Sequence, residues 1–404
     1  MPFLQPFDVR IHFPYTLLEQ HEAASHTGEH LMSRMGQKPA TASGAKRDTF
    51  LLSALFLLTL PALLLSLACS PPRVTPSPGT ATVDRQLSLM GTTATVSVEG
   101  VDHTTALAAS ERAIRALEEA EARLSTWRDD SELSRFNRME VGHPFLLSPE
   151  LARVLQSAWY WWRETSGAFD PGIGALIQTW GLRQGGRVPG TEDLAYALAC
   201  NGLTSLRLEG ETAVRLHPGL GIEEGGFGKG AGLDEAIVAM GAPGVVGGVI
   251  NLGGQIALLG DGKEGTFGIA DPDDRNRMVL TVQIGRGSLA TSGNSERGIE
   301  VGGVRYGHIL DPKLGRPARD FGSLTVWAPT ALAADCLSTG LYVMGPDTAL
   351  AWTLGRSDIE TLILERTATG LRVRATSGWQ GRLSAKDRVT IEYVKRIADS
   401  DQRP

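Results

Sequence analysis

The sequence has few cysteines and no excess of positive charge. Only 3 of its 404 residues are cysteine, which excludes a disulfide framework, so a hydrophobic core must hold the fold together. Hydrophobic residues make up 42% of the chain and charged residues 21%, as in ordinary soluble globular proteins. The formal net charge of −6 argues against a nucleic-acid-binding protein, which usually carries a basic excess.

The sequence also lacks a Gly-x-Gly-x-x-Gly motif placed after an expected strand, so a doubly wound dinucleotide-binding sheet is not favoured. Glycine itself is abundant, with 48 residues. Many stand in pairs, which indicates tight turns and close backbone approach instead of a low-complexity linker. Cys200 and Cys336 lie in apolar surroundings and are expected to be buried free thiols.

One long hydrophobic run, residues 50–69, follows the basic pair Lys46 and Arg47 and carries no charge. This order is typical of a secretory signal. Its end, Ser66-Leu67-Ala68-Cys69, is similar to the lipobox of bacterial lipoproteins, in which the cysteine becomes lipidated, although the usual leucine three places before the cysteine is Ser66 here. The alternative is an uncleaved transmembrane anchor, interrupted by Pro61. Both interpretations place the residues after 70 outside the cytoplasm.

The chain is therefore divided into four parts. Residues 1–69 form an N-terminal extension and lipoprotein signal peptide, whose true start is Met32 or Met35 because a signal peptide has a short basic region. Residues 70–84 are rich in Pro, Ser and Thr and are expected to be a flexible tether. Residues 85–397 form one domain, and 398–404 form a disordered tail.

Strand and helix patterns alternate irregularly within this domain, which predicts a mixed α+β fold. Residues 104–124 place Leu107, Ile114, Leu117 and Leu124 on one helical face. Ser148-Pro149-Glu150 is typical of a helix start, and the apolar stripe that follows runs to Trp162. Strands are expected at Thr93–Val98, at Val245–Leu252 and in a hairpin around Thr369-Gly370.

Two polar residues of a helical segment, Asp335 and Thr339, lie four residues apart and so share one helix face. A carboxylate and a hydroxyl are hard oxygen ligands that suit Mg²⁺. Such a pair is also common on protein surfaces, so the spacing alone does not establish a metal site.

A glycine-rich run, Glu223–Gly232, presents backbone N–H groups and one positive charge, Lys229. Runs of this kind let a phosphate come close to the backbone, but many loops contain them without that function.

Several further runs bring polar and aromatic residues together. They are Met90-Gly91-Thr92, Ser125-Thr126-Trp127-Arg128, Gly167-Ala168-Phe169-Asp170-Pro171, Asn251-Leu252-Gly253-Gly254-Gln255, Ala290-Thr291-Ser292-Gly293 and Tyr306-Gly307-His308-Ile309-Leu310-Asp311-Pro312. The aromatic Trp127 can stack on a flat heterocycle, or be half-buried packing. Asp311 can orient His308 or cap the turn at Pro312.

Taken in order, these runs resemble the family of FAD:protein FMN transferases of the ApbE type, over residues 88–345. The resemblance implies the family's compact α+β fold of two intertwined subdomains, with the flavin in the cleft between them. It implies a Mg²⁺ site formed by Asp335, Thr339 and the carbonyl of Gly226. It also implies FAD contacts from the following residues: Met90, Trp127, Ala168, Phe169, Asp170, Glu223, Lys229 and Leu310.

Three residues depart from the family pattern: Glu223 replaces an aspartate, Gly228 an alanine, and Gln255 an aspartate or asparagine. The longer Glu223 side chain must fold back or shift the ligand. Gln255 is interpreted as part of the shape around the cleft.

The activity implied by the resemblance is Mg²⁺-dependent transfer of FMN from FAD to a threonine of a target flavoprotein, with AMP released. His308 is the catalytic candidate, because imidazole accepts a proton near neutral pH. The implied partner is a membrane redox complex subunit with an extracytoplasmic threonine, and a lipid at Cys69 would hold the chain on the extracytoplasmic face of a bacterial membrane. Two alternatives remain: an FAD pyrophosphatase that yields FMN and AMP, and a non-catalytic FAD-binding lipoprotein.

Overall fold

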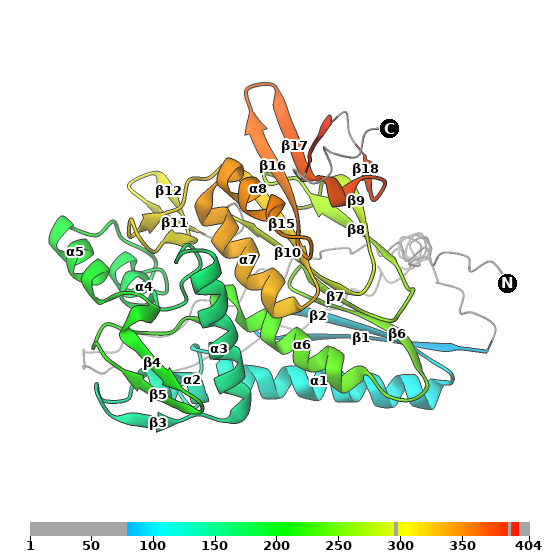
Figure 1. The fold of residues 1–404 in the computed structure, drawn as a ribbon, viewed down its shortest axis with the longest axis horizontal. Helices are drawn as coiled ribbons and strands as arrows, with labels where there is room; N and C mark the ends of the chain where they lie inside the picture. Colours follow the sequence, from blue (N-terminus) through cyan, green and yellow to red (C-terminus); the bar gives the residue numbers. More distant parts are fainter. Residues whose placement is uncertain (1–78, 295–297, 387–388, 396–404) are drawn as a thin grey trace, which may run out of the picture. The chain divides into compact units, whose positions relative to one another are not determined.

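A nine-stranded sheet in the order β1-β2-β6-β7-β10-β15-β16-β17-β19 forms the centre of the fold (Figure 1). The computed structural model describes residues 79–294, 298–386 and 389–395. The strands of this sheet are β1 (Ala81–Leu89), β2 (Thr92–Gly100), β6 (Val245–Leu252), β7 (Gln255–Leu259), β10 (Gly287–Gly293), β15 (Gly322–Ala328), β16 (Glu360–Thr367), β17 (Gly370–Thr376) and β19 (Ile391–Val394). Neighbouring strands are antiparallel except β17 and β19, which are parallel.

Within the described residues, four smaller sheets accompany the main one. They are β18 (Leu383–Ala385), β9 (Met278–Ile284) and β8 (Gly265–Ala270); β3 (Pro144–Leu146), β5 (Thr212–Arg215) and β4 (Leu206–Glu209); β11 (Gly298–Val301) with β12 (Val304–Gly307); and β13 (Leu310–Asp311) with β14 (Arg316–Pro317).

The helices in the described ranges connect these strands. They are α1 (His103–Leu124), α2 (Glu132–Asn137), α3 (Pro149–Glu164), α4 (Gly174–Trp180), α5 (Thr191–Cys200), α6 (Gly228–Met240), α7 (Ala331–Met344) and α8 (Pro346–Leu354), with the 3-10 turns η1 (Leu203–Ser205), η2 (Glu224–Gly226) and η3 (Ser377–Trp379). None of these helices is long and apolar enough to span a membrane. The expected mixed α+β fold is confirmed.

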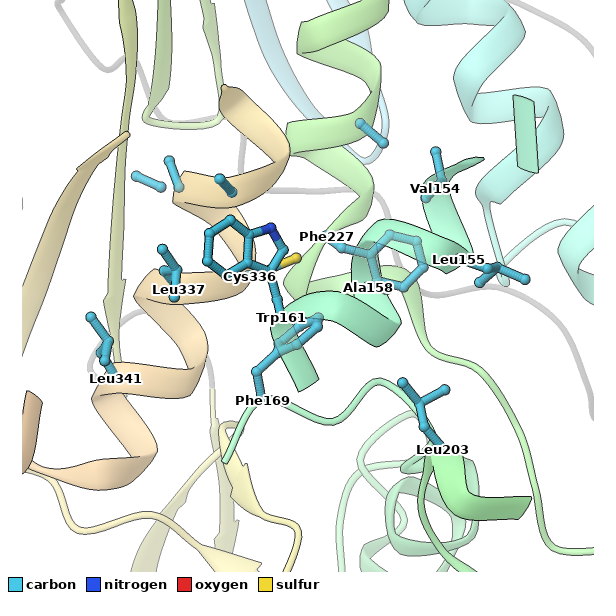
Figure 2. Close-up of a cluster of buried hydrophobic side chains, with 14 of the residues drawn as sticks. Val154, Leu155, Ala158, Trp161, Phe169, Leu203, Phe227, Cys336, Leu337 and Leu341 are labelled. Atoms are coloured by element: carbon cyan, nitrogen blue, oxygen red, sulfur yellow. The ribbon is translucent and has the colours of Figure 1, made fainter. Parts of the chain in front are cut away.

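The main sheet is covered differently on its two faces, because successive side chains of a strand point in opposite directions. On β6, Val249 packs in a cluster with side chains of β8 and β9, whereas Ile250 packs with α1 and α6. Helix α7 lies along β10 and β15 and contributes Leu337 and Leu341 to the largest cluster, together with α3 (Figure 2). The central strands are therefore buried on both faces.

Helix α1 corresponds closely to the expected segment, but its buried face differs from the one expected. Leu117 and Leu124 are buried as predicted, whereas Leu107 is 37% exposed. Four alanines complete the buried face: Ala106, Ala109, Ala113 and Ala120. Their small side chains allow α1 to lie close to both the sheet and α6, which a pattern search weighted toward large apolar residues does not detect.

Helix α3 begins as its sequence indicates. Pro149 is its first residue, and the hydroxyl of Ser148 accepts a hydrogen bond from the amide of Leu151, a cap that contributes about 1 kcal/mol. The buried aromatic residue of the stripe is Trp161, where Trp162 was expected, and Tyr160 is exposed.

The other local predictions are confirmed: strands β2 and β6, the β16–β17 hairpin, and buried free thiols at Cys200 and Cys336. Burial also raises the pKa of the Cys336 thiol, which disfavours the thiolate form.

The predicted tether ends too late. Strand β1 begins at Ala81, and Ala81–Asp84 pair with Ser97–Gly100 of β2, so the ordered domain starts before residue 85. The hydrophobic run at 50–69 with Cys69, the possible starts Met32 and Met35, and the tail at 398–404 lie outside the described residues.

Candidate active site

Helix α7 brings Asp335 and Thr339 to one face, as the spacing predicted. The helix begins after Thr330, whose hydroxyl accepts a hydrogen bond from the amide of Ala333 at 3.3 Å. Asp335 is 4% exposed, whereas Thr339 is partly accessible. A buried carboxylate needs hydrogen-bonding or charged partners to remain ionised.

The start of α6 supplies those partners to Asp335. The amide of Gly230 donates to Oδ2 of Asp335 at 2.9 Å, and Nζ of Lys229 lies 3.5 Å from its Oδ1. Two segments that are about a hundred residues apart in sequence therefore meet at one carboxylate, and the glycine-rich run contributes both an N–H group and a positive charge.

A second carboxylate, Asp234, fixes the two helices to each other, and the sequence reasoning did not find it. Asp234 lies on α6, and its oxygens accept hydrogen bonds from the first two amides of α7, those of Ala331 at 2.6 Å and Leu332 at 2.9 Å. Burial is the main cause that raises the pKa of Asp234, and nearby Asp335 adds to it. Because an acidic residue on α6 has no local signature of this role, only the packing of the helices reveals it.

Gly226 lies directly against Thr339. A methyl group added at Gly226 would lie 3.3 Å from the hydroxyl oxygen of Thr339 and 3.3 Å from Cε2 of Phe169. The three proposed metal ligands Gly226, Asp335 and Thr339 are thus brought together by η2 and two turns of α7.

The donor chemistry of this group fits Mg²⁺. One carboxylate, one hydroxyl and a backbone carbonyl are all hard oxygen donors, and Mg²⁺ in phosphate-transferring sites usually takes few protein ligands beside water and substrate phosphate. Within the described ranges, no group of three or more His, Cys, Asp or Glu side chains could hold a metal. Mg²⁺ binding at Asp335 stays a prediction.

The Asp170 loop follows the end of α3 through Ser166 and Gly167, which both have positive φ angles, 50° and 77°. Asp170 Oδ2 accepts a hydrogen bond from the indole of Trp162 at 2.8 Å, and Oδ1 accepts from the amides of Gly172 at 2.8 Å and Leu203 at 3.1 Å. Burial raises the pKa of Asp170 to about 6, although these hydrogen bonds act to lower it. Asp170 thus organises its loop, and its contact with FAD stays a prediction.

Three of the predicted FAD contacts are buried in protein. Ala168 is buried, Phe169 belongs to the largest core cluster (Figure 2), and Leu310 packs with Leu176 and Trp180 of α4. Their side chains shape the surrounding segments, and their contact with FAD stays a prediction.

Met90, another predicted FAD contact, lies between β1 and β2 with a φ angle of 50° and is partly accessible. Its amide donates to Oε1 of Glu121 at 3.0 Å. Its sulfur would lie 3.3 Å from a methyl group added at Gly232, so the side chain packs against the glycine face of α6.

Glu223 and Trp127 are connected through residues that the sequence reasoning missed. Arg183 donates to the carboxylate of Glu223 and to the hydroxyl of Thr126, and its guanidinium lies 4.5 Å from the ring centroid of Trp127. The backbone amide of Thr126 donates to Glu224 at 3.0 Å. Burial raises the pKa of Glu223 to about 7, although the charge of Arg183 opposes the shift. The Glu223 side chain is thus directed toward Arg183.

His308 lies half-buried between β12 and β13. Ile309, the residue after His308, donates a backbone hydrogen bond to Oδ1 of Asn294 at 3.1 Å, which fixes its position. Oδ1 of Asp311 accepts hydrogen bonds from the amides of Lys313 at 2.8 Å and Leu314 at 3.1 Å. Asp311 therefore caps the turn, one of the two roles that the sequence left open. A catalytic role for His308 stays a prediction.

Strand β10 connects the His308 segment with α7. The hydroxyl of its Ser292 is hydrogen-bonded to the hydroxyl of Ser338 at 2.9 Å, and the Ser338 hydroxyl donates to the carbonyl of Asp335 at 3.0 Å. Asn294 follows directly after this strand and holds Ile309. The Ala-Thr-Ser-Gly run and the adjacent Asn294 therefore connect the helix of Asp335 to the loop of His308.

Comparison with known proteins identifies the family. The model of the ApbE family matches residues 90–363. The chain belongs to the ApbE family. The FAD:protein FMN transferase of Vibrio cholerae is 34% identical over 278 residues, 67% of this chain and 83% of the relative. That of Haemophilus influenzae is 30% identical over 321 residues, 74% of this chain and 92% of the relative.

Solved structures of the ApbE family agree with the fold. The flavin transferase ApbE from Vibrio cholerae has a TM-score of 0.66 and 31% identity, covering 75% of this chain and 99% of that one. The apo flavinyl transferase ApbE of Pseudomonas stutzeri has a TM-score of 0.65 and 25% identity, covering 75% and 97%. The family match begins at Met90 and extends beyond Thr339, so it includes every candidate site residue except Cys69.

Two of the departures from the ApbE pattern have a local reason in this chain. A methyl group added at Gly228 would lie 3.0 Å from Cβ of Glu224, so glycine leaves room for the Glu224 side chain that holds Thr126. Gln255 is buried, and its amide nitrogen donates to the carbonyl of Ala331 at 2.8 Å, at the first turn of α7. These substitutions affect the packing around the site.

Proposed function

We propose that this protein transfers FMN from FAD to a threonine hydroxyl of another protein and releases AMP. Its ApbE-family relatives are named FAD:protein FMN transferases, which supports this proposal. The observation that carries the proposal is the meeting of Asp335, Thr339, Gly226 and Lys229 at the start of α6 and the middle of α7.

The reaction is a phosphoryl-type transfer. The threonine oxygen forms a bond to the FMN-side phosphorus of FAD, the bond from that phosphorus to the bridging oxygen breaks, and AMP leaves with the electron pair. The hydroxyl proton passes to a base, and His308 is the proposed acceptor because a neutral imidazole accepts protons near pH 7. Such reactions depend mainly on positioning and charge stabilisation, so no covalent intermediate with the enzyme is needed.

Different residues of the chain have different proposed roles in this reaction. Lys229 places a positive charge beside the Asp335 carboxylate, where a pyrophosphate group would be attracted. The glycine-rich run lets a phosphate approach the backbone at the start of α6. Mg²⁺, held by Asp335, Thr339 and the Gly226 carbonyl, would neutralise charge on the pyrophosphate.

An assay with FAD, Mg²⁺ and a flavoprotein that is known to carry threonine-linked FMN tests the proposal. We expect a fluorescent acceptor band in a denaturing gel, an acceptor mass increased by one FMN moiety, and one AMP for each FMN attached. Asp335→Ala should produce no labelled acceptor. Free FMN and AMP as the sole products would instead establish hydrolysis, and unchanged FAD after prolonged incubation would indicate a binding protein.

We also propose that the chain acts at the extracytoplasmic face of a bacterial membrane, held by a lipid on Cys69. The support is the sequence of residues 50–69. In cells given a radioactive fatty acid, the wild-type protein should become labelled and Cys69→Ser should not. Membrane attachment without label in the wild type would favour an uncleaved anchor.

A further inference from the structure

The guanidinium of Arg183 covers one face of Trp127. Arg183 lies between α4 and α5, and its Cζ is 4.5 Å from the centroid of the Trp127 ring. A planar guanidinium over an indole gains both cation–π attraction and stacking. Trp127 nevertheless remains 70% exposed with Arg183 in place. One face of the ring is therefore supported by protein, while much of the rest is open to solvent.

Arg183 is itself held in a fixed orientation. Its Nη1 donates to the carbonyl oxygen of Thr126 at 2.9 Å, and its Nη2 donates to the hydroxyl of Thr126 and to the carboxylate of Glu223. The Glu223 side chain is 18% exposed, so this ion pair is largely shielded from water. Because the guanidinium is a rigid planar fork, contacts at both terminal nitrogens fix the plane that faces the indole.

The acceptors of Arg183 are anchored in turn to the glycine-rich run. The amide of Glu223 donates to the carbonyl of Pro171 at 2.8 Å, and the amide of Thr126 donates to Glu224 at 3.0 Å. The two glutamates directly precede Gly225 and Gly226. The same short run that lies against Thr339 therefore also positions the residue that supports Trp127.

We propose that Arg183 is a positioning residue that holds the indole of Trp127 as a one-sided platform, on whose open face a planar ring of FAD stacks. The inference rests on the proposed function, because FAD must be the substrate. It assigns a binding role to Arg183 that acts through Trp127, without direct contact between Arg183 and the dinucleotide. It also gives the Glu223 carboxylate a function in this chain, since a side chain shorter by one methylene would reach less far toward Arg183.

Calorimetric titration with FAD at fixed Mg²⁺, without any acceptor protein, tests the inference. We expect Arg183→Ala to weaken FAD binding by about tenfold, since stacking of a base on an aromatic ring is of that order. Trp127→Ala should weaken it at least as much. The double variant should bind no more weakly than Trp127→Ala, because Arg183 has nothing left to position. Losses that multiply in the double variant would overturn the inference, as would unchanged FAD affinity in Arg183→Ala.

Two further variants separate positioning from simple charge. Arg183→Lys keeps the positive charge but loses the planar group, so it should bind FAD nearly as weakly as Arg183→Ala. Arg187→Ala is the matched control from the same segment, where the guanidinium bonds to the carbonyl of Thr179 at 2.8 Å, and it should bind FAD as the wild type does. If Arg183→Lys bound FAD with the affinity of the wild type, the proposed role of the planar guanidinium would be wrong.

Titration with FMN and with AMP distinguishes the two rings of FAD. A weaker affinity of Arg183→Ala for FMN assigns the platform to the isoalloxazine, and a weaker affinity for AMP assigns it to the adenine. If the variant binds both as the wild type does, the stacking inference is wrong.

Turnover at saturating FAD should be little changed in Arg183→Ala, since the chemistry lies elsewhere. If the wild type binds no FAD, the proposed function fails as well, whereas an unaffected variant refutes only this inference.

Discussion

Gly230 and Ala331 lie so close together that no side chain fits between them. A methyl group added at Gly230 would lie inside van der Waals contact with the carbonyl oxygen of Ala331 and 2.7 Å from Cα of Leu332. These neighbours are backbone atoms, which cannot rotate away as a flexible side chain could. The close approach of α6 to α7 also brings the amide of Gly230 to Asp335.

Gly230→Ala should therefore destabilise the protein and impair the site. We expect a loss of about 2 kcal/mol in the free energy of unfolding, the usual range for an overpacked core, together with reduced FMN transfer because α6 must move away from Asp335. Urea denaturation and the transfer assay measure the two effects. Gly225→Ala, in the same run but with nothing within 4 Å of the added methyl, is the control and should be stable. Equal stability of the two variants would contradict this packing argument.

Asp335→Asn should uncouple FAD binding from Mg²⁺. The asparagine oxygen can still accept the hydrogen bond from Gly230, so the fold should persist, but the charge that a divalent cation requires is removed. We expect Mg²⁺ to tighten FAD binding to the wild type at least tenfold in calorimetric titrations, since neutralising charge on the pyrophosphate is worth several kcal/mol. In the variant, the affinity for FAD should be independent of Mg²⁺. A variant that responds to Mg²⁺ as the wild type does would place the cation elsewhere.

His308→Ala should reduce turnover while leaving FAD affinity nearly unchanged. Removal of a general base typically costs 10²- to 10⁴-fold in rate, and we expect a loss of about that size. Added imidazole should restore part of the activity, because it can accept the proton in place of the side chain. His143→Ala, at an exposed position of the same chain, serves as the control. Turnover within twofold of the wild type would remove His308 from the mechanism.

Asp170→Asn should change how stability depends on pH. Burial raises the pKa of Asp170 from 3.8 to about 6, so the folded protein holds this proton more tightly than the unfolded chain does. The contribution to stability is therefore complete below about pH 4 and is lost as the pH rises through about 6, by at most about 3 kcal/mol. The variant, which cannot ionise, should lack this decline. Urea denaturation between pH 4 and 7 tests it, and parallel profiles for the two proteins would show that another group is responsible.

The local elements of the site could be predicted from the sequence. The helix that carries Asp335 and Thr339, the start of α3 at Ser148 and the β16–β17 hairpin all depend on residues within one or two turns of each other. Helical spacing and capping are short-range properties, so the sequence pattern contains them. The buried alanine face of α1 was missed because large apolar side chains dominate such patterns.

Contacts between distant segments could not be predicted in this way. Asp234 binds the amide of Ala331, which lies 97 residues further along the chain, and Arg183 reaches Thr126 across 57 residues and Glu223 across 40. Arg183 in particular stands in a segment rich in glycine and arginine, with no pattern that distinguishes it from neighbouring Arg187. The local sequence does not determine which hydrogen-bond acceptor a long, flexible side chain contacts.

The sequence by itself determined the α+β class, the family and the residue types that can hold a cation and a phosphate, because these depend on composition, short-range periodicity and motif order. Only the tertiary structure decided which groups surround Asp335 and that Trp127 has one covered face. The physical reason is that such partnerships depend on how α6, α7 and the segment before α5 pack in space, and packing minimises the free energy of the whole chain at once.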